Sequence, residues 1–250
     1  MILVFGKTGQ VATELQRMRN MHSPSTDIVF LGRDEADLAN PQACADRIST
    51  LKPSYVINAA AYTAVDKAED EPELAQLVNG DAPKAMARAA QAIDVPFYHI
   101  STDYVFDGRG ETPFKPDDPV GPLGVYGQTK LAGELGIKEV HSAATILRTS
   151  WVFSAHGSNF VNTMLTHGAR NAELRVVADQ VGGPTPAADI AATLMIMADP
   201  NLPGPKPGTY HYSGEPNVSW AEFAREIFTQ AAKPTKVINI PSSAYETRAK

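Results

Sequence analysis

The residues Ile2-Leu3-Val4-Phe5-Gly6-Lys7-Thr8-Gly9-Gln10-Val11-Ala12 decide the fold of this chain. Ile2–Phe5 is a continuous apolar run, as expected of a strand buried on both faces of a parallel sheet. A G-x-x-G-x-x-A turn follows and opens a helical pattern over Val11–Met21. In this context glycines let the backbone turn tightly and aim helix N–H groups at a pyrophosphate. We therefore predict a bound dinucleotide here; the alternative is a tight strand–helix turn without a ligand.

The composition is that of a globular protein with a large α/β domain. The chain has 250 residues, 43% of them hydrophobic and 20% charged, with a formal net charge of −6. Negative charge without a Lys/Arg block argues against nucleic acid or an anionic membrane as partners. No apolar run reaches the roughly 18 residues that span a bilayer, and Met1 leads into a strand rather than a signal peptide. Cys44 is the single cysteine, so we expect no internal disulfide and a cytoplasmic protein.

Strand-like and helical patterns alternate through the first half of the chain. This order predicts right-handed β-α-β units and an α/β fold with a doubly wound parallel sheet, of the Rossmann-like class. The predicted strands after the first are Asp27–Leu31, Tyr55–Asn58, Phe97–Ile100 and Ala144–Leu147, and the predicted helices are Pro41–Leu51, Val65–Ala92 and Tyr126–Val140.

The second half is less regular and carries more Pro and Gly. Ser219 followed by Glu222 predicts a capping box at the start of a helix over Trp220–Ala232. We predict a dinucleotide-binding domain over residues 1–151 and a smaller substrate-side region over residues 152–250, interleaved with the first. The other predicted elements are helices Asn159–Asn171 and Ala187–Ala198 and strands Leu174–Val177 and Tyr210–Tyr212.

Small and polar residues follow the third and fourth predicted strands. Asn58-Ala59-Ala60-Ala61-Tyr62-Thr63 offers small side chains against which a cofactor can lie. Ser101-Thr102-Asp103-Tyr104-Val105-Phe106 places hydroxyl groups at the end of the fourth strand. The Pro/Gly-rich segment Asp107–Gly124 is long enough to be a functional loop. Open α/β sheets bind ligands at the carboxyl ends of their strands, so we expect both segments beside the dinucleotide.

Tyr126 and Lys130 stand one turn apart on the helix that follows the loop. A cation beside a phenol favours the phenolate, so we expect Lys130 to lower the pKa of Tyr126 and make it a proton donor. An ordinary, partly exposed helix pair is the alternative. The position of the pair, after the fourth strand, favours a shared site with Thr102.

The end of the second strand bears on which dinucleotide is bound. Arg33 suits the 2′-phosphate of NADPH, whereas Asp34 and Glu35 suit the free ribose of NADH. A solvated charged turn is equally compatible with these three residues. Asp37 and Leu38 are predicted to bracket the adenine.

Together these segments resemble an extended short-chain dehydrogenase/reductase, and specifically the dTDP-4-dehydrorhamnose reductase family. The resemblance implies hydride transfer from NADPH or NADH to the C4 keto carbon of dTDP-4-dehydro-L-rhamnose, giving dTDP-L-rhamnose. The segments that carry it are Phe5–Val11, Asn58–Glu69, Ser101–Phe106, Val125–Gly133, Arg148–Val152 and Asp179–Thr185.

The resemblance also implies residue roles. Tyr126 would protonate the developing alkoxide, Lys130 would hold the nicotinamide ribose, and Thr102 would hydrogen bond the carbonyl oxygen. Asp103, Tyr104 and Trp151 would contact the nucleotide sugar, although Trp151 is equally compatible with a buried core aromatic. The cofactor-binding residues would be Gly6, Thr8, Gly9, Gln10, Val11, Arg33, Asp37, Leu38, Ala60, Ala61, Tyr62, Thr63, Ile100, Tyr126 and Lys130.

Three further implications concern assembly and ions. Family members are expected to continue for several tens of residues past Tyr245, and that segment would carry dimer contacts and a magnesium site. The resemblance therefore implies a homodimer and Mg²⁺, with metal ligands outside this chain. The six histidines are scattered without metal-ligand spacing, so we predict no metal site among them.

Two other functions remain compatible with the sequence. One is a non-catalytic dinucleotide-binding regulatory subunit, such as the beta subunit of methionine adenosyltransferase, which would not need Thr102, Tyr126 and Lys130 as a set. The other is a nucleotide-sugar epimerase or dehydratase on the same scaffold. Dehydratases favour acidic residues beside the catalytic threonine, and Asp103 leaves that alternative open.

Overall fold

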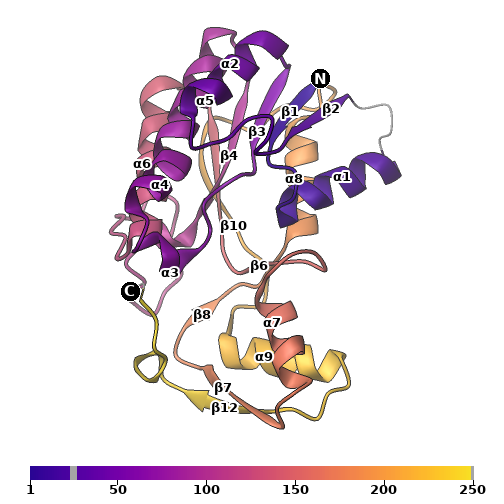
Figure 1. Cartoon of the computed structure of the whole chain (residues 1–250), viewed down its shortest axis with the longest axis vertical. Coiled ribbons are helices and arrows are strands. Elements are labelled where there is room, and N and C mark those ends of the chain that lie inside the picture. The colour runs from indigo at the N-terminus through magenta and orange to yellow at the C-terminus, as the bar shows by residue number, and fades with distance from the viewer. Residues whose placement is uncertain (23–26, 249–250) are drawn as a thin grey trace.

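A computed structural model describes residues 1–22 and 27–248 of the chain. Figure 1 shows a larger part, built on one sheet between two layers of helices, and a smaller part at the opposite end of the long axis. The two parts are joined by several crossings of the chain, because segments from the second half return to the larger part. No described helix is long and apolar enough to cross a membrane.

The sheet has six parallel strands in the order β10-β5-β4-β3-β1-β2. After β2 the chain returns past β1 to form β3 on its other edge, so the direction of winding reverses between β1 and β3. Such a reversal opens a crevice at the carboxyl ends of the two strands, where doubly wound sheets bind ligands. The predicted doubly wound parallel sheet is confirmed. Its strands are β1 (Ile2–Phe5), β2 (Ile28–Leu31), β3 (Tyr55–Asn58), β4 (Phe97–Thr102), β5 (Thr145–Thr149) and β10 (Gly208–Tyr212).

Helices cover both faces of the sheet (Figure 1). On one face α2 (Pro41–Leu51), α5 (Ala82–Ala92) and α6 (Val125–Val140) pack side by side, and on the other α1 (Gln10–His22) packs against α8 (Ala187–Met197). Strand β1 shows why both faces are apolar: Leu3 and Phe5 enter the core under α2 and α5, while Ile2 and Val4 enter the core under α1 and α8. Successive side chains of a strand point to opposite faces of the sheet. Because both faces are buried here, every residue of β1 is apolar.

The segment Val65–Ala92, predicted as one helix, is divided in the structure, so that prediction is wrong. It forms α3 (Val65–Ala68), α4 (Pro72–Gln76), a π-helical turn over Leu77–Asp81 and then α5. Pro72 starts α4 and Pro83 lies in the first turn of α5. Proline has no N–H to donate and is tolerated at first turns, so it favours new helix starts over one continuous helix.

The smaller part has its own core. Parallel strands β7 (Glu173–Val177) and β12 (Lys236–Ile240) pack with α7 (Phe160–Gly168) and α9 (Trp220–Gln230). The predicted capping box at Ser219 and Glu222 is present at the start of α9. The remaining elements are β6 (Val152–Phe153), β8 (Val181–Gly182), β9 (Thr185–Pro186), β11 (Val218–Ser219) and the short 3-10 turns η2 (Asp103–Val105) and η3 (Ser242–Ala244).

Candidate active site

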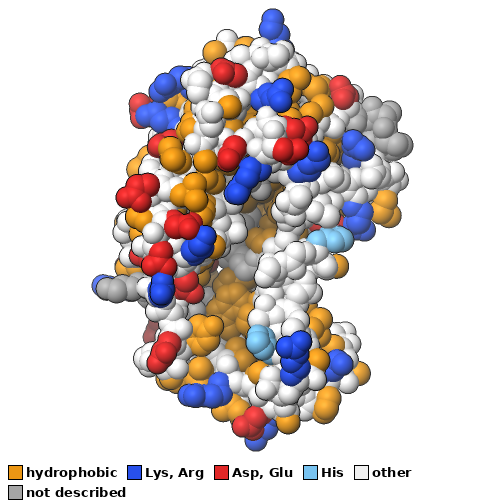
Figure 2. Space-filling view, in the orientation of Figure 1, with side chains coloured by type: hydrophobic (Ala, Val, Ile, Leu, Met, Phe, Trp, Pro, Cys, Tyr) orange, Lys and Arg blue, Asp and Glu red, His pale blue; other side chains and the backbone are white. Residues whose placement is uncertain are grey.

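The predicted site segments meet at the carboxyl edge of the sheet, which faces the smaller part of the molecule (Figure 1). The Gly6–Gly9 turn follows β1, residues 59–64 follow β3, and Thr102 is the last residue of β4. Figure 2 shows the molecule hollowed between its two parts on this side, with hydrophobic surface exposed inside the hollow. The crevice therefore offers apolar surface to a ligand at the carboxyl edge of the sheet.

The glycine turn has the form of a phosphate cradle. Gly6 has a φ of +109°, and a Cβ there would lie 3.3 Å from the carbonyl carbon of Ala59, so a side chain would be strained and crowded. Thr8 and Gly9 are exposed, and helix α1 begins at Gln10 with its first N–H groups free of helical partners. These groups fit a pyrophosphate, because a helix N-terminus attracts negative charge.

Two predicted cofactor residues use their side chains elsewhere. The amide oxygen of Gln10 accepts from Ser154 Oγ at 3.1 Å and from Asn159 Nδ2 at 2.9 Å, which ties α1 to the smaller part. Val11 is buried in the core. Both residues can therefore serve a phosphate only through their backbone N–H groups.

Of the three predicted cofactor residues after β2, one is exposed and two make contacts within the protein. Arg33 lies in an exposed turn after β2, two residues before Glu35, whose carboxylate binds Lys7 at 3.1 Å. Asp37 accepts the Ala39 N–H at 2.9 Å within its own turn, and Leu38 packs in the core. The structure gives Asp37 and Leu38 local structural contacts, and Arg33 is the one of the three that is exposed.

The segment after β3 is held in place by a buried asparagine from the π-helical turn. Asn79 accepts the Tyr62 N–H at 2.8 Å and donates to the Tyr62 carbonyl at 3.1 Å. Its amide also donates to Thr129 of α6 at 3.3 Å. The π-turn thus places the Asn79 side chain against the backbone of Tyr62, in the segment that lines the crevice. Single π-helical turns of this kind are frequent at functional sites.

Thr102 and Tyr126 lie together. Thr102 lies near the Tyr126 phenol and lowers its pKa, and the Thr102 hydroxyl donates to Asp103 at 3.1 Å and accepts the Tyr104 N–H at 3.2 Å. The Tyr104 ring meets the Tyr126 ring edge to face, with centroids 5.3 Å apart. Burial raises the pKa of Asp103 to about 6, although its contact with Thr102 opposes the shift. The structure therefore brings together the hydroxyl and the phenol that the sequence placed 24 residues apart.

The expected effect of Lys130 on Tyr126 is wrong for this structure. Desolvation by burial raises the pKa of Tyr126 well above its usual value, and the contact with Thr102 offsets only part of that rise. The Lys130 amine is instead turned toward β4, where it meets His99 Nε2 at 3.2 Å and donates to the Ile100 carbonyl at 2.7 Å. The phenol is consequently held in its protonated form, ready to donate a proton.

Lys130 is 1% exposed, and burial lowers the pKa of its ammonium to about 8, with Glu134 opposing that shift. Glu134 belongs to a buried brace one turn farther along α6. Its carboxylate binds Arg148 at 2.7 Å and accepts from Ser101 Oγ at 2.6 Å. Arg148 also donates to the Pro116 carbonyl at 3.1 Å, so the brace fixes α6, β4 and the long loop relative to one another.

Trp151 lies between the two parts of the molecule. Its ring stacks on Trp220 with centroids 3.4 Å apart and an interplanar angle of 10°, and its backbone has a φ of +48°. Such a φ is rare for a residue with a bulky side chain. The ring is half-buried. Both uses that the sequence suggested, packing and substrate contact, are compatible with this position.

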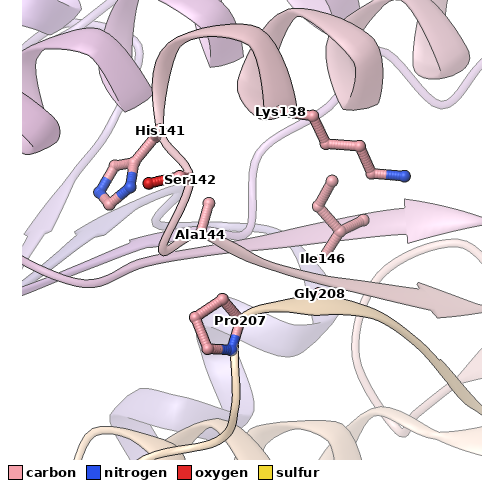
Figure 3. A pocket seen from close by; sticks show the side chains of 7 residues that line it. All are labelled: Lys138, His141, Ser142, Ala144, Ile146, Pro207 and Gly208. Atoms are coloured by element: carbon pink, nitrogen blue, oxygen red, sulfur yellow. The ribbon is translucent and has the colours of Figure 1, made fainter.

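A separate pocket lies at the opposite edge of the sheet (Figure 3). It is formed where α6 ends and where β5 and β10 begin, so it opens away from Thr102 and Tyr126. None of the predicted site residues contributes to it. Its lining residues are Lys138, His141, Ser142, Ala144, Ile146, Pro207 and Gly208.

His99 and Asn58 were missed as site residues, since the scattered histidines showed no pattern in the sequence that would single out His99. Alternate residues of β4 face α6, where His99 meets Lys130 and Ser101 meets Glu134. His99 and Ser101 are two residues apart in a strand, and Lys130 and Glu134 are four residues apart in a helix. Each pair therefore lies on one face of its element, and this spacing is the signal in the sequence that could have indicated a contact between the two pairs. Among the described residues, no group of three or more His, Cys, Asp or Glu side chains could hold a metal ion.

Comparison with known proteins places this geometry in a family. The family model described as the RmlD substrate binding domain matches residues 1–250. The chain is 42% identical to a dTDP-4-dehydrorhamnose reductase of Sinorhizobium fredii and 40% identical to one of Escherichia coli. Both matches cover 100% of this chain and 86% of the relative.

A solved structure gives the same result in three dimensions. The dTDP-4-dehydrorhamnose reductase of Bacillus anthracis, in complex with NADP, superposes with a TM-score of 0.92 at 33% identity. The match covers all of this chain and 86% of the other. Matches over the full length of this chain, in sequence and in fold, confirm the resemblance stated from the motifs. The chain belongs to the RmlD substrate binding domain family, the family of the dTDP-4-dehydrorhamnose reductases.

Proposed function

We propose that this chain reduces the C4 keto group of dTDP-4-dehydro-L-rhamnose to the hydroxyl of dTDP-L-rhamnose, with NADPH or NADH as the reductant. The observation that carries the proposal is that Thr102 and Tyr126 share one site beyond the end of β4: the Tyr104 N–H donates to Thr102, and the Tyr104 ring meets the Tyr126 ring at 5.3 Å. The full-length relatives are enzymes of this activity, and one of them is described in complex with NADP.

The residues present fit a nicotinamide dinucleotide. The Gly6–Gly9 turn and the N-terminus of α1 would bind the pyrophosphate, and Ala60 and Ala61 leave room for the cofactor beside β3. When bound, the reduced nicotinamide supplies the hydride. Lys130, one turn from Tyr126, would bind the hydroxyls of the nicotinamide ribose.

The proton transfer is assigned to Tyr126. Because burial raises the pKa of this phenol, it carries its proton at neutral pH and can give it to the alkoxide that forms at C4. Thr102 would donate a hydrogen bond to the same oxygen as negative charge develops on it. Asp103, Tyr104 and Trp151 are the side chains proposed to contact the nucleotide sugar.

The reductant preference is a finer proposal. Arg33 stands exposed at the end of β2, where an adenosine ribose would lie, and its guanidinium would suit a 2′-phosphate. We therefore assign NADPH as the preferred reductant. The homodimer and the magnesium ion stay predictions from the family resemblance.

The test is an assay of absorbance loss at 340 nm with dTDP-4-dehydrorhamnose, made with NADPH or NADH and with or without Mg²⁺. Oxidation of the reductant that needs the keto sugar, together with formation of dTDP-rhamnose, supports the proposal. Tight binding of the dinucleotide without turnover would instead indicate a regulatory dinucleotide-binding subunit. Release of water or epimerisation of a nucleotide sugar would indicate the dehydratase or epimerase alternative.

A further inference from the structure

Lys130 is held by a line of buried polar contacts that begins at the backbone of Ala60. The Ala60 N–H donates to Asn58 Oδ1 at 3.1 Å, and Asn58 Nδ2 lies 3.1 Å from His99 Nδ1. His99 Nε2 in turn lies 3.2 Å from Lys130 Nζ. All three side chains are at most 1% exposed, so water does not substitute for these partners.

The order of donors along this line fixes the tautomer of His99. Because the Ala60 N–H must meet the amide oxygen of Asn58, the NH₂ group of Asn58 faces the ring, and Nδ1 has to accept. Burial and the neighbouring Lys130 both lower the pKa of His99, so the ring is neutral and carries one proton. That proton is then on Nε2, the nitrogen that faces Lys130.

An Nε2–H group has no favourable contact with an ammonium, which has no lone pair. It does have one with a neutral amine, which can accept at Nζ while donating one of its own hydrogens to the Ile100 carbonyl at 2.7 Å. The second amine hydrogen then remains for a ligand. The opposite arrangement would require the Asn58 amide to turn, placing its NH₂ against the Ala60 N–H.

We propose that Asn58 and His99 are positioning residues that hold the Lys130 amine against β4 and, through the Nε2–H tautomer, favour its neutral amine over its ammonium. This inference deepens the proposed function. Its kinetic consequence rests on the reductase activity, whereas the tautomer of His99 does not. If the reduction needs the ammonium beside Tyr126, the pair limits the pH range of activity on the alkaline side. The pKa of Lys130, lowered to about 8 by burial, lies in the range where such a limit is measurable.

Other charges around Lys130 do not replace this effect. Glu134 favours the ammonium but shares its carboxylate with Arg148 and Ser101. On the outer side of the helices, Lys84 pairs with Glu139, and Asp81 accepts from Gln76. The titratable groups that contact Lys130 or shift its pKa are His99 of β4 and Glu134 of α6. Other titratable groups on α6 and on segments that contact it are Tyr126 of α6, Asp103 of η2, Glu69 beside the start of α6, Asp81 of the π-turn and Lys84 of α5, and Arg148 of β5 binds Glu134.

The first test uses the unaltered chain and needs no turnover. Long-range ¹H–¹⁵N correlation spectra of protein labelled with ¹⁵N-histidine report which ring nitrogen carries the proton, and His99→Gln identifies the signal by its loss. We expect the neutral Nε2–H tautomer of His99 at pH 7.5 and at pH 9. A neutral Nδ1–H tautomer, or an imidazolium, at either pH would overturn the inference whether or not the chain is a reductase.

The second test inverts the line of contacts with one isosteric change. In Asn58→Asp, one carboxylate oxygen can accept the Ala60 N–H while the other accepts from His99 Nδ1–H, which leaves Nε2 as an acceptor for the Lys130 ammonium. We expect the inverted tautomer in the spectra. We also expect the alkaline limb of the kcat/KM profile to move up by on the order of one pH unit.

His141→Gln is the matched control, because His141 is also buried but binds the Val95 carbonyl at the far end of β4. Its pH profile should match that of the unaltered chain. A tautomer that inverts in Asn58→Asp without any movement of the alkaline limb would overturn the proposed control of Lys130. The same limb movement in His141→Gln would also overturn it, since a general loosening of the core would then explain the change.

Discussion

Replacing Gly127 with alanine should displace the proton donor Tyr126 without altering the chemistry of any proposed catalytic side chain. A Cβ at position 127 would lie 2.2 Å from the carbonyl oxygen of Tyr104 and 2.9 Å from Cβ of Pro122. Contacts of a Cβ below 3.0 Å are essentially never found, so α6 and η2 must separate by about 0.8 Å. The obstacle is backbone, which cannot rotate away as a long side chain can. Tyr126, the preceding residue of the helix, and Thr102, which precedes η2, would move apart with them.

The magnitudes follow from the size of that separation. A misplacement near 1 Å can lower a rate about 100-fold, so we expect kcat to fall roughly 10- to 100-fold. Overpacking costs about 1–3 kcal/mol, and alanine in a helix returns about 1 kcal/mol relative to glycine. The net loss of about 0–2 kcal/mol lowers Tm by at most roughly 8 °C for a chain of this length. The variant therefore stays folded at 25 °C, where the assay is made.

Gly136→Ala is the control, since it makes the same change in the same helix. There the nearest atoms belong to the Lys84 side chain, at 3.0 to 3.2 Å, and they can adjust. We expect its kcat to equal that of the unaltered chain and its Tm to be equal or higher. Steady-state kinetics and thermal unfolding by circular dichroism measure both variants. Folded Gly127→Ala with kcat within two-fold of the unaltered chain would refute the argument that close packing of α6 on η2 sets the catalytic geometry.

Three further predictions concern individual side chains. Tyr126→Phe removes only the proton donor, so kcat should fall at least about 100-fold while the dissociation constant of NADPH, measured by fluorescence titration, stays within two-fold; equal losses in both would contradict the assigned role. Arg33→Ala should raise KM for NADPH several-fold and leave KM for NADH unchanged, and an unaltered ratio of the two values would rule out the 2′-phosphate contact. Glu134→Ala leaves Arg148 charged and buried without its partner, which should cost about 3–5 kcal/mol and lower Tm by roughly 6–20 °C in thermal unfolding. Glu139→Ala, which removes an exposed pair on the same helix, should change stability by less than about 1 kcal/mol; similar Tm shifts in the two variants would show that burial of the brace is not what makes it strong.

Local patterns in the sequence were sufficient for much of the fold. The apolar run Ile2–Phe5, the glycine turn behind it and the alternation of strands with helices predicted a doubly wound parallel sheet, which the structure confirms. The helix bearing Tyr126 and Lys130 was placed within one residue of α6. These features can be predicted from the sequence because burial of one or both faces of a helix or strand fixes the spacing of apolar residues along it. Where prolines and a π-turn interrupted such a period, over Val65–Ala92, the prediction of a single helix was wrong.

The sequence by itself determined which chemical groups are present: a phenol, an amine, a hydroxyl and a phosphate-sized glycine turn. Only the tertiary structure decided the protonation and partners of those groups. Burial raises the pKa of Tyr126 where the neighbouring lysine had been expected to lower it, and Lys130 meets His99, 31 residues earlier in the chain. Desolvation depends on every atom packed around a group, and partners from different elements depend on strand register and helix rotation. Neither quantity is set by residues adjacent in sequence, and for that reason neither can be read from a local motif.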